Sequence, residues 1–244
     1  MSKSRAMQEG KKVAVYQPYF FPYIGYWQLI DAVDVFIIGD SFQYIMRGFI
    51  NRNKILLNHA PHRFTISLRG SSPQKRISEI EILDDFGKFR KMLAHAYGNA
   101  GHYSEAMELI DQILCYPDRN LARFLGHQIA SVAEYMGLHT EIVYMSELDV
   151  PEDLSSREQR LCHLVREVGG DRIINPIGSK SLYSARDFNQ RGIGLSVLES
   201  RKISYPQKGC KFIPGLSLID ALMHCGKSQL TSLIKSYDTL DQQE

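Results

Sequence analysis

Two polar side chains that could perform chemistry each follow a buried strand in this sequence. Gln17 comes after the apolar run from Lys12 to Tyr16, and Asp40 comes after a second run from Asp34 to Gly39. In an open α/β sheet, ligands bind at the carboxyl ends of parallel strands, where the loops meet. There Gln17 could hydrogen-bond a sugar or an amide, and Asp40 could orient an amine or act as a base. We therefore expect Asp40 and Gln17 to be the catalytic groups; the alternative is that both only close loops.

The loop between these strands is rich in aromatic rings. Tyr19, Tyr23 or Tyr26 could stack on a sugar ring, although large rings more commonly fill a core. A phenol has a pKa of about 10, so Tyr16 is a poor base at neutral pH. We expect Tyr16, Tyr23 and Tyr26 to contact substrate, with core packing as the competing role.

A polar and basic stretch follows the second strand. It contains Gln43, Arg47, Asn51 and Arg52. Arginine can grip a phosphate through two hydrogen bonds, and asparagine can bind the edge of a sugar or base. The diphosphate of a nucleotide-linked sugar needs such groups. The alternative is a solvated hairpin face, which is the usual fate of a short charged run.

A turn after a later strand is a second candidate for phosphate binding. The segment from Gly178 through Lys180 to Ser181 could present backbone N–H groups to a phosphate. It does not match the P-loop pattern, and no G-x-G-x-x-G occurs, so no dinucleotide cofactor is expected. His59 and His62 flank a proline with no third ligand nearby, so we predict no metal site.

The elements that must position these residues follow an α/β pattern. Strand, loop, helix and strand between Lys12 and Gly39 form a βαβ unit, which is typical of a parallel sheet. Further strands are predicted at 53–57, 63–68, 77–83, 140–144, 171–175 and, as the last, 193–199. Helices are predicted at 26–33, 84–97, 103–114, 120–136, 156–168, 216–225 and 228–237. We predict a three-layer, mainly parallel α/β fold with a helical insertion near 84–137, forming one domain over 12–244 after a disordered lead-in, 1–11.

The composition is that of an ordinary soluble protein with balanced charge. Its 29 Lys and Arg against 27 Asp and Glu give a net charge of +2, which argues against a general binder of nucleic acid. No apolar stretch approaches the roughly 20 residues of a membrane-spanning helix, and the polar first twelve residues do not resemble a signal peptide. The four cysteines form no C-x-x-C pair, which favours buried, reduced thiols. We predict a cytoplasmic protein without a membrane partner.

Three blocks of this sequence resemble a known family. Val13 to Trp27 is similar to the opening signature of the WbqC-like family, Asp40 to Ile55 to its second block, and Tyr205 to Asp220 to a third. The family's usual histidine before Gln-Pro is Tyr16 here, and its usual tryptophan after the second proline is Tyr23. A mechanism that needs an imidazole at the first position is therefore in doubt for this chain.

The resemblance implies a role in bacterial surface-polysaccharide (O-antigen) biosynthesis, as a transferase that adds glycine or a similar acyl group to the amine of a nucleotide-linked amino sugar. Glycine or a glycyl donor, including an aminoacyl-tRNA, would be the second substrate, and ATP would be needed if the enzyme activates the acyl group. Tyr205 and Gln207 are matched family positions and join the expected substrate-binding residues. Asp220 is matched as well, and is as compatible with a structural ion pair as with catalysis.

Two other readings stay open. One is a non-catalytic protein that binds a glycan precursor. The other is an adenylating enzyme related to nucleotidylyltransferases, because the segment Pro22 to Tyr26 echoes their His-x-Gly-His motif, with tyrosines at both histidine positions. An oligomer is compatible with the sequence.

Overall fold

The structure is a computed structural model that describes residues 10–151, 153–207, 209 and 211–242. Most of the expected lead-in thus lies outside the described residues, and its last residue, Lys11, already belongs to a strand. At the centre is a six-stranded sheet in the order β10-β9-β8-β1-β2-β7. The strands are β1 (Lys11–Tyr16), β2 (Val35–Ile38), β7 (Glu141–Tyr144), β8 (Gly170–Pro176), β9 (Gly194–Ser200) and β10 (Tyr237–Asp241).

All neighbouring strands in this sheet run parallel except β10, which is antiparallel to β9. The expected pairing of β1 with β2 is present, with Val13 opposite Val35 and Tyr16 opposite Ile38. These central strands are apolar and rich in β-branched side chains because both of their faces are covered. The predicted mainly parallel α/β fold is confirmed.

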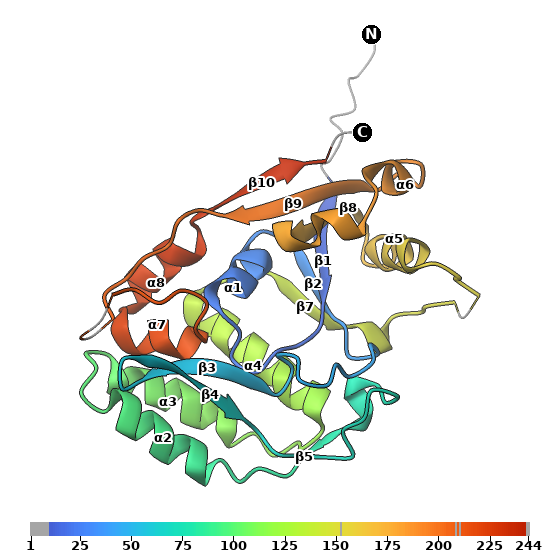
Figure 1. Cartoon of the computed structure of the whole chain (residues 1–244). Coiled ribbons are helices and arrows are strands. Elements are labelled where there is room, and N and C mark those ends of the chain that lie inside the picture. Colours follow the sequence, from blue (N-terminus) through green and yellow to red (C-terminus); the bar gives the residue numbers. More distant parts are fainter. Residues whose placement is uncertain (1–9, 152, 208, 210, 243–244) are drawn as a thin grey trace.

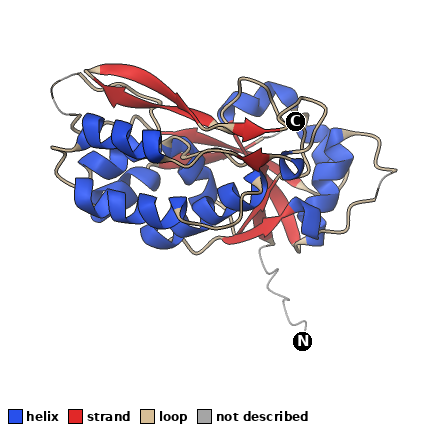
Figure 2. Ribbon diagram, turned by 90° about the horizontal axis from the view of Figure 1, so that it is seen from below, coloured by secondary structure: helices blue, strands red, loops and turns tan. Residues whose placement is uncertain are grey.

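Helices cover both faces of the sheet (Figure 2). Successive side chains of a strand point to opposite faces, so Val13 and Val15 join one buried cluster while Ala14 joins the other. The first cluster packs against α5 (Arg157–Glu167) and α6 (Ala185–Asn189). The second packs against α1 (Ile24–Asp31), α4 (Leu121–Met136), α7 (Leu218–His224) and α8 (Lys227–Ile234).

A lobe of hairpins and helices lies between β2 and β7 in the sequence (Figure 1). It contains the hairpin β3 (Arg52–Leu57) and β4 (Ala60–Thr65), the short pair β5 (Leu68–Arg69) and β6 (Glu81–Ile82), and the helices α2 (Gly87–Tyr97), α3 (Tyr103–Leu114) and α4. The three helices fall within the predicted insertion.

The aromatic loop after β1 joins the sheet to this lobe. Phe20 is fully buried, and its ring contacts those of Phe64, Phe86, Phe89 and Phe124. The core of the α1 face therefore continues without a break into the lobe. The assignment of 12–244 to a single domain stays a prediction.

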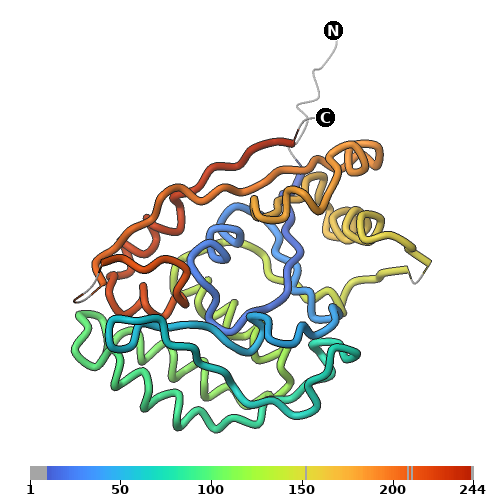
Figure 3. The backbone as a smooth tube through the Cα atoms, viewed as in Figure 1, coloured from blue at the N-terminus to red at the C-terminus, as the bar shows by residue number. Residues whose placement is uncertain are grey.

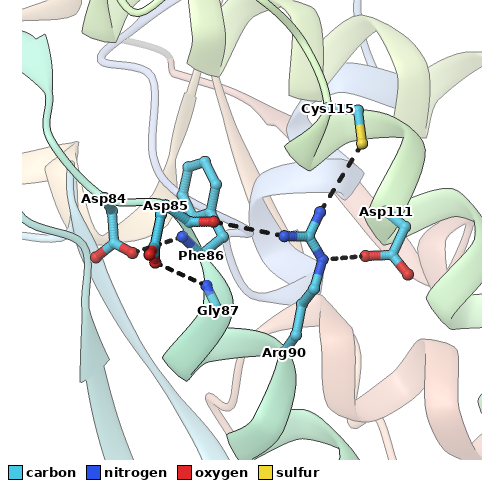
Figure 4. A network of polar contacts seen from close by, with 7 residues as sticks. All are labelled: Asp84, Asp85, Phe86, Gly87, Arg90, Asp111 and Cys115. Atoms are coloured by element: carbon cyan, nitrogen blue, oxygen red, sulfur yellow. Dashed lines mark hydrogen bonds and ion pairs between the residues drawn. The ribbon is translucent and has the colours of Figure 1, made fainter.

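The start of α2 is fixed by two aspartates (Figure 4). Phe86 has a φ of +61°, a left-handed conformation that is costly for a bulky residue. The Asp84 carboxylate accepts the Phe86 N–H at 2.8 Å, and the Asp85 carboxylate accepts the Gly87 N–H at 2.9 Å. Arg90 then ties α2 to α3 through the Asp111 carboxylate and lies 3.9 Å from the Cys115 sulfur. Cys115 is exposed, contrary to the expectation of buried thiols.

Two sequence predictions are wrong, one about which strand is last and one about the element type. The segment 193–199 is not the last strand, because the helix predicted over 228–237 ends at Ile234 and β10 follows it. β10 is an exposed edge strand with no apolar alternation to mark it. The strand predicted over 77–83 is instead a short 3-10 helix, η1 (Ile77–Glu79), followed by β6.

Candidate functional site

A cavity of about 1070 Å³ opens at the carboxyl ends of the parallel strands. This is the edge at which open α/β sheets bind ligands. Its walls come from the end of β1, the loop after β2, the segment before η1, the start of α5 and the end of the turn after β8. Three of the predicted site residues line it together, namely Tyr16, Gln17 and Gln43.

The first wall carries Tyr16 and Gln17. The Gln17 side-chain amide donates to the Gln43 backbone oxygen at 3.1 Å, so the loops after β1 and β2 are joined across the edge of the sheet. Burial raises the pKa of Tyr16, and a hydrogen bond with Tyr19 offsets part of that effect. Tyr16 is therefore a neutral phenol at physiological pH, able to hydrogen-bond a ligand but not to serve as its base.

The second wall is η1 and the residues just before it. Gln43 and Arg76 form an isolated β-bridge, and the Ile77 N–H donates to the Phe42 backbone oxygen at 3.0 Å. These bonds hold a segment from the lobe alongside the loop after β2 (Figure 3). As a result Arg76 and Glu79 both line the cavity.

The third wall is the start of α5. Ser156 caps this helix, because its hydroxyl accepts the Gln159 N–H at 3.1 Å while the Gln159 side chain accepts the Ser156 N–H at 3.1 Å. Arg157 and Arg160 follow within the first turn and line the cavity. Residues three apart lie on the same side of a helix, so both guanidinium groups face the same region. The Arg160 Nε also donates to the Leu154 backbone oxygen at 3.0 Å, which braces its side chain.

The lining is therefore strongly basic. Among the described residues that surround the cavity, three are arginines and one is a carboxylate, Glu79. None of these arginines belongs to an ion pair within the described part of the chain. Several cations gathered around one concave site attract an anionic ligand more strongly than the same cations spread over an open surface. Phosphate or diphosphate is the ligand chemistry that suits this wall best.

Asp40 lies behind the cavity wall rather than on it. It is 1% exposed, and both carboxylate oxygens accept hydrogen bonds from Ser146, one from the backbone N–H at 2.9 Å and the other from the hydroxyl. Its backbone oxygen accepts the Ser78 N–H at 3.1 Å. Asp40 thereby ties the loop after β2 to η1 and to the turn after β7. Catalysis by Asp40 stays a prediction; the geometry gives it a structural task.

The other two predicted tyrosines have different surroundings. Tyr26 is buried, and its hydroxyl donates to the Gln17 backbone oxygen at 2.9 Å, so it supports the first wall from below. Tyr23 is 41% exposed at the start of α1. Burial raises its pKa, and the Tyr16 phenol adds to the shift.

The polar stretch after β2 is mostly turned away from the cavity. Asn51 is buried, where it accepts the Tyr44 hydroxyl at 2.8 Å and donates to the Ile66 backbone oxygen at 2.9 Å. Arg52 is half-buried on β3, and its Nε has no partner among the described residues. Arg47 is exposed in a left-handed turn with a φ of +62°. The structure does not bring these three side chains to the cavity lining.

The turn after β8 is the 3-10 helix η3 (Ile177–Leu182), which contains Gly178, Lys180 and Ser181. All three are exposed, and none of them lines the cavity. The turn nevertheless leads directly into Leu182 and Tyr183, which do line it. This predicted phosphate site is thus a neighbour of the cavity.

Tyr205 and Gln207 belong to a separate, buried network around Asp220. The Asp220 carboxylate accepts the Tyr97 hydroxyl at 2.7 Å, the Tyr205 hydroxyl at 2.8 Å and the Gln207 amide at 2.8 Å. Asp220 is 0% exposed. A buried carboxylate with three donors is fully satisfied. This network joins α2, α7 and the 205–207 loop, and none of its members lines the cavity.

Four charged lining residues were not found from the sequence: Arg76, Glu79, Arg157 and Arg160. The only available signal was the Ser-x-x-Gln capping box at Ser156, which predicts a helix start but not its position on the sheet. No sequence pattern pointed to Asn175 on β8 either, a buried polar residue outside the cavity lining. It is 5% exposed, and its side-chain nitrogen has no hydrogen-bond partner in the described part of the chain. It lies two residues after Ile173 and so on the α5 face of the sheet, the face that also carries Val15 of the cavity lining.

In the part of the chain that the structure describes, no three His, Cys, Asp or Glu side chains gather in a way that could hold a metal ion. None of the described helices combines the length and the apolar composition needed to cross a bilayer. The side chains that could hold a phosphorylated ligand or cofactor are the three cavity arginines.

Comparison with known proteins identifies the family. The chain is 25% identical over 221 residues to an uncharacterised protein of Mycobacterium tuberculosis, Rv1507c, in an alignment that covers 88% of this chain and 94% of that protein. No solved structure matches. The sequence profile of the WbqC-like protein family matches residues 17–232, which include all three blocks noted in the sequence except the first four residues of the opening one. The chain therefore belongs to the WbqC-like protein family.

Proposed function

We propose that this protein transfers glycine, or a similar acyl group, onto the amine of a nucleotide-linked amino sugar in surface-polysaccharide biosynthesis. The observation that carries the proposal is the cavity at the carboxyl edge of the sheet, with arginines on the second and third walls and amide and phenol groups on the first. Ligand pockets commonly have volumes of roughly 300–1000 Å³. The volume of about 1070 Å³ therefore suits a ligand as large as a nucleotide sugar.

The lining suits a ligand that has an anionic part and a neutral part, because the arginines and the uncharged polar groups lie on different walls. Arg76, Arg157 and Arg160 are suited to the diphosphate, because a guanidinium forms paired hydrogen bonds with phosphate oxygens. Gln17 and Tyr16, at the end of β1, are suited to the sugar hydroxyls, because amides and neutral phenols both donate and accept hydrogen bonds. In this arrangement the sugar lies at the end of β1, next to the bonded pair of loops.

The reaction is the attack of the sugar amine on an activated glycyl carbonyl. A C–N bond forms, the bond from the carbonyl carbon to the leaving oxygen breaks, and the amine loses one proton. The donor is a glycyl ester such as glycyl-tRNA, or a glycyl phosphate anhydride made from glycine and ATP. The near-balanced net charge of +2 gives no general surface for RNA, so recognition of a tRNA donor would have to be local.

Mass spectrometry of the sugar nucleotide tests the proposal. Purified protein is incubated with a uridine-diphosphate amino sugar and either glycine with ATP or glycyl-tRNA, and a gain of one glycyl unit is expected. The N-acetylated form of the same sugar nucleotide is the matched control, because its nitrogen is blocked and it should gain nothing. Absence of a product with several amino sugars and both donors would contradict the proposed transfer.

Two other outcomes point to the rival functions. Saturable binding of the sugar nucleotide without any product would indicate a binding protein. Release of pyrophosphate from ATP in the presence of glycine but without the sugar would indicate an adenylating activity. Each result is read from the same incubations, with product mass, ligand depletion and pyrophosphate measured in parallel.

A further inference from the structure

We propose that Glu79 is the residue that recognises the amine of the sugar and accepts its proton. This inference rests on the proposed function, because it assigns a role within that cavity and reaction. Glu79 is the only carboxylate among the described residues that line the cavity, and no histidine lines it. Burial raises the pKa of Tyr16 and of Tyr19, which are also in the lining, so these phenols are weaker candidates for a base.

Asp40, the carboxylate favoured by the sequence, is buried and held by its own chain. Both of its oxygens are engaged by Ser146, and the residue is 1% exposed. A base must come within hydrogen-bond distance of the proton that it takes. Asp40 is not among the described residues that line the cavity, whereas Glu79 is.

The Glu79 side chain is held in place by one hydrogen bond, which engages only one of its two carboxylate oxygens. One carboxylate oxygen accepts the Arg76 backbone N–H at 2.6 Å, which closes the first turn of η1. No hydrogen bond is recorded at its other oxygen among the described residues. The backbone beneath is fixed on both sides, since the Ser78 N–H donates to the Asp40 oxygen at 3.1 Å and the Asn120 side chain donates to the Ser78 oxygen at 2.6 Å.

The charges in the cavity give this carboxylate a distinct task. Three arginines attract the diphosphate but repel the ammonium form of an amino sugar. A single carboxylate in such a lining offers the one position at which that ammonium is stabilised. The ammonium first loses one proton to solvent, because only the neutral amine has a lone pair. When that amine attacks the activated glycyl carbonyl, nitrogen gains a bond and becomes positively charged. Glu79 then takes one proton from nitrogen, and the electron pair of the broken bond leaves with the oxygen of the donor.

The binding test compares two ligands and three forms of the protein. Calorimetry measures the Kd of uridine-diphosphate glucosamine and of uridine-diphosphate N-acetylglucosamine for the unmodified protein, Glu79→Gln and Glu81→Gln. Gln can still accept the Arg76 N–H, so η1 should be preserved. Glu81 is the matched control, because it is exposed on β6, pairs with Arg69 and does not line the cavity.

We expect the unmodified protein and Glu81→Gln to prefer the free amine by about tenfold at pH 7, the worth of one hydrogen-bonded charge pair. Glu79→Gln should lose that preference while it keeps its affinity for the N-acetylated ligand. If the unmodified protein binds both ligands but Glu79→Gln keeps the preference, the role of Glu79 is wrong and the proposed function survives. If neither ligand binds to the unmodified protein, the proposed sugar-nucleotide site fails, and this inference fails with it.

A kinetic test separates proton transfer from binding. Glu79→Gln should lower kcat by about 100-fold, at the low end of the usual effect of general-base catalysis, and Glu79→Asp should restore part of it. The pH profile of kcat should differ between the unmodified protein and Glu79→Gln, because the variant lacks the ionisable base. An unchanged pH profile in Glu79→Gln would overturn the proton-accepting role.

Discussion

Two polar networks in this molecule are each built around one carboxylate, and they differ in access to the cavity. Asp220 is fully buried and accepts hydrogen bonds from Tyr97, Tyr205 and Gln207. Glu79 lines the cavity, and the one hydrogen bond described for its side chain comes from a backbone N–H. A carboxylate whose lone pairs are taken by its own chain stabilises the fold, while one with a free oxygen beside a cavity can act on a ligand. Family matching alone pointed to the first network, and only geometry revealed the second.

The largest expected effect is on the buried network. Asp220→Ala would leave two hydroxyl groups and one amide without their buried acceptor. Each unsatisfied buried donor costs about 1–3 kcal/mol, so we expect the free energy of unfolding to fall by about 3–5 kcal/mol. Urea unfolding followed by circular dichroism measures this. Glu79→Gln is the comparison and should change stability by less than about 0.5 kcal/mol; equal losses in the two variants would remove the distinction.

The next effect concerns ligand binding at the third wall. The double variant Arg157→Ala, Arg160→Ala should weaken binding of a uridine-diphosphate sugar by about 100-fold, because charge-assisted hydrogen bonds to the diphosphate are lost. The measurement is calorimetric titration. Arg63→Ala, an exposed arginine on β4 outside the cavity lining, is the control and should bind as the unmodified protein does. A loss of less than threefold in the double variant would move the diphosphate to another wall.

Variants of Asp40 test whether this carboxylate is structural, like Asp220, or acts on a ligand, as proposed for Glu79. Asp40→Ala removes the acceptor for the Ser146 N–H and hydroxyl, so unfolding should become easier by about 1–3 kcal/mol. Asp40→Asn keeps one acceptor oxygen and should cost less. Denaturant unfolding gives both values, and transferase activity is then compared at equal folded protein. An activity loss in Asp40→Asn far beyond its loss of stability would return Asp40 to a catalytic role.

The smallest effect is a pH dependence near the buried network. Burial, with a contribution from Asp220, raises the pKa of the Cys225 thiol to about 11. A group whose pKa is raised by folding contributes stability that is complete below its unfolded pKa and is lost as pH rises through the folded value. Part of the decline in unfolding free energy between pH 9 and 11 should therefore disappear in Cys225→Ala. Cys115→Ala, at an exposed thiol, should leave the decline unchanged.

Much of the fold was predictable because local patterns carry it. The apolar runs of β1 and β2, the exact span of α3 and the glycine that ends α4 all follow from spacing and capping in the sequence. Gly137 indeed adopts a left-handed φ of +73° at that end. β10 escaped prediction because an exposed edge strand needs no apolar alternation, and its existence depends on pairing with β9.

The sequence by itself determined the family, the α/β class and the edge of the sheet at which the cavity opens, because these depend on contiguous motifs and on strand order along the chain. The charges around the cavity were decided only by tertiary structure. Arg76 and Glu79 arrive from the lobe, and Arg157 and Arg160 from the helix before β8, so no short motif contains them together. Tertiary structure also decided that Asp40 and Asp220 are hydrogen-bonded by their own chain. Their donors Ser146 and Tyr97 lie 106 and 123 residues away in the sequence, so no local pattern could reveal these bonds.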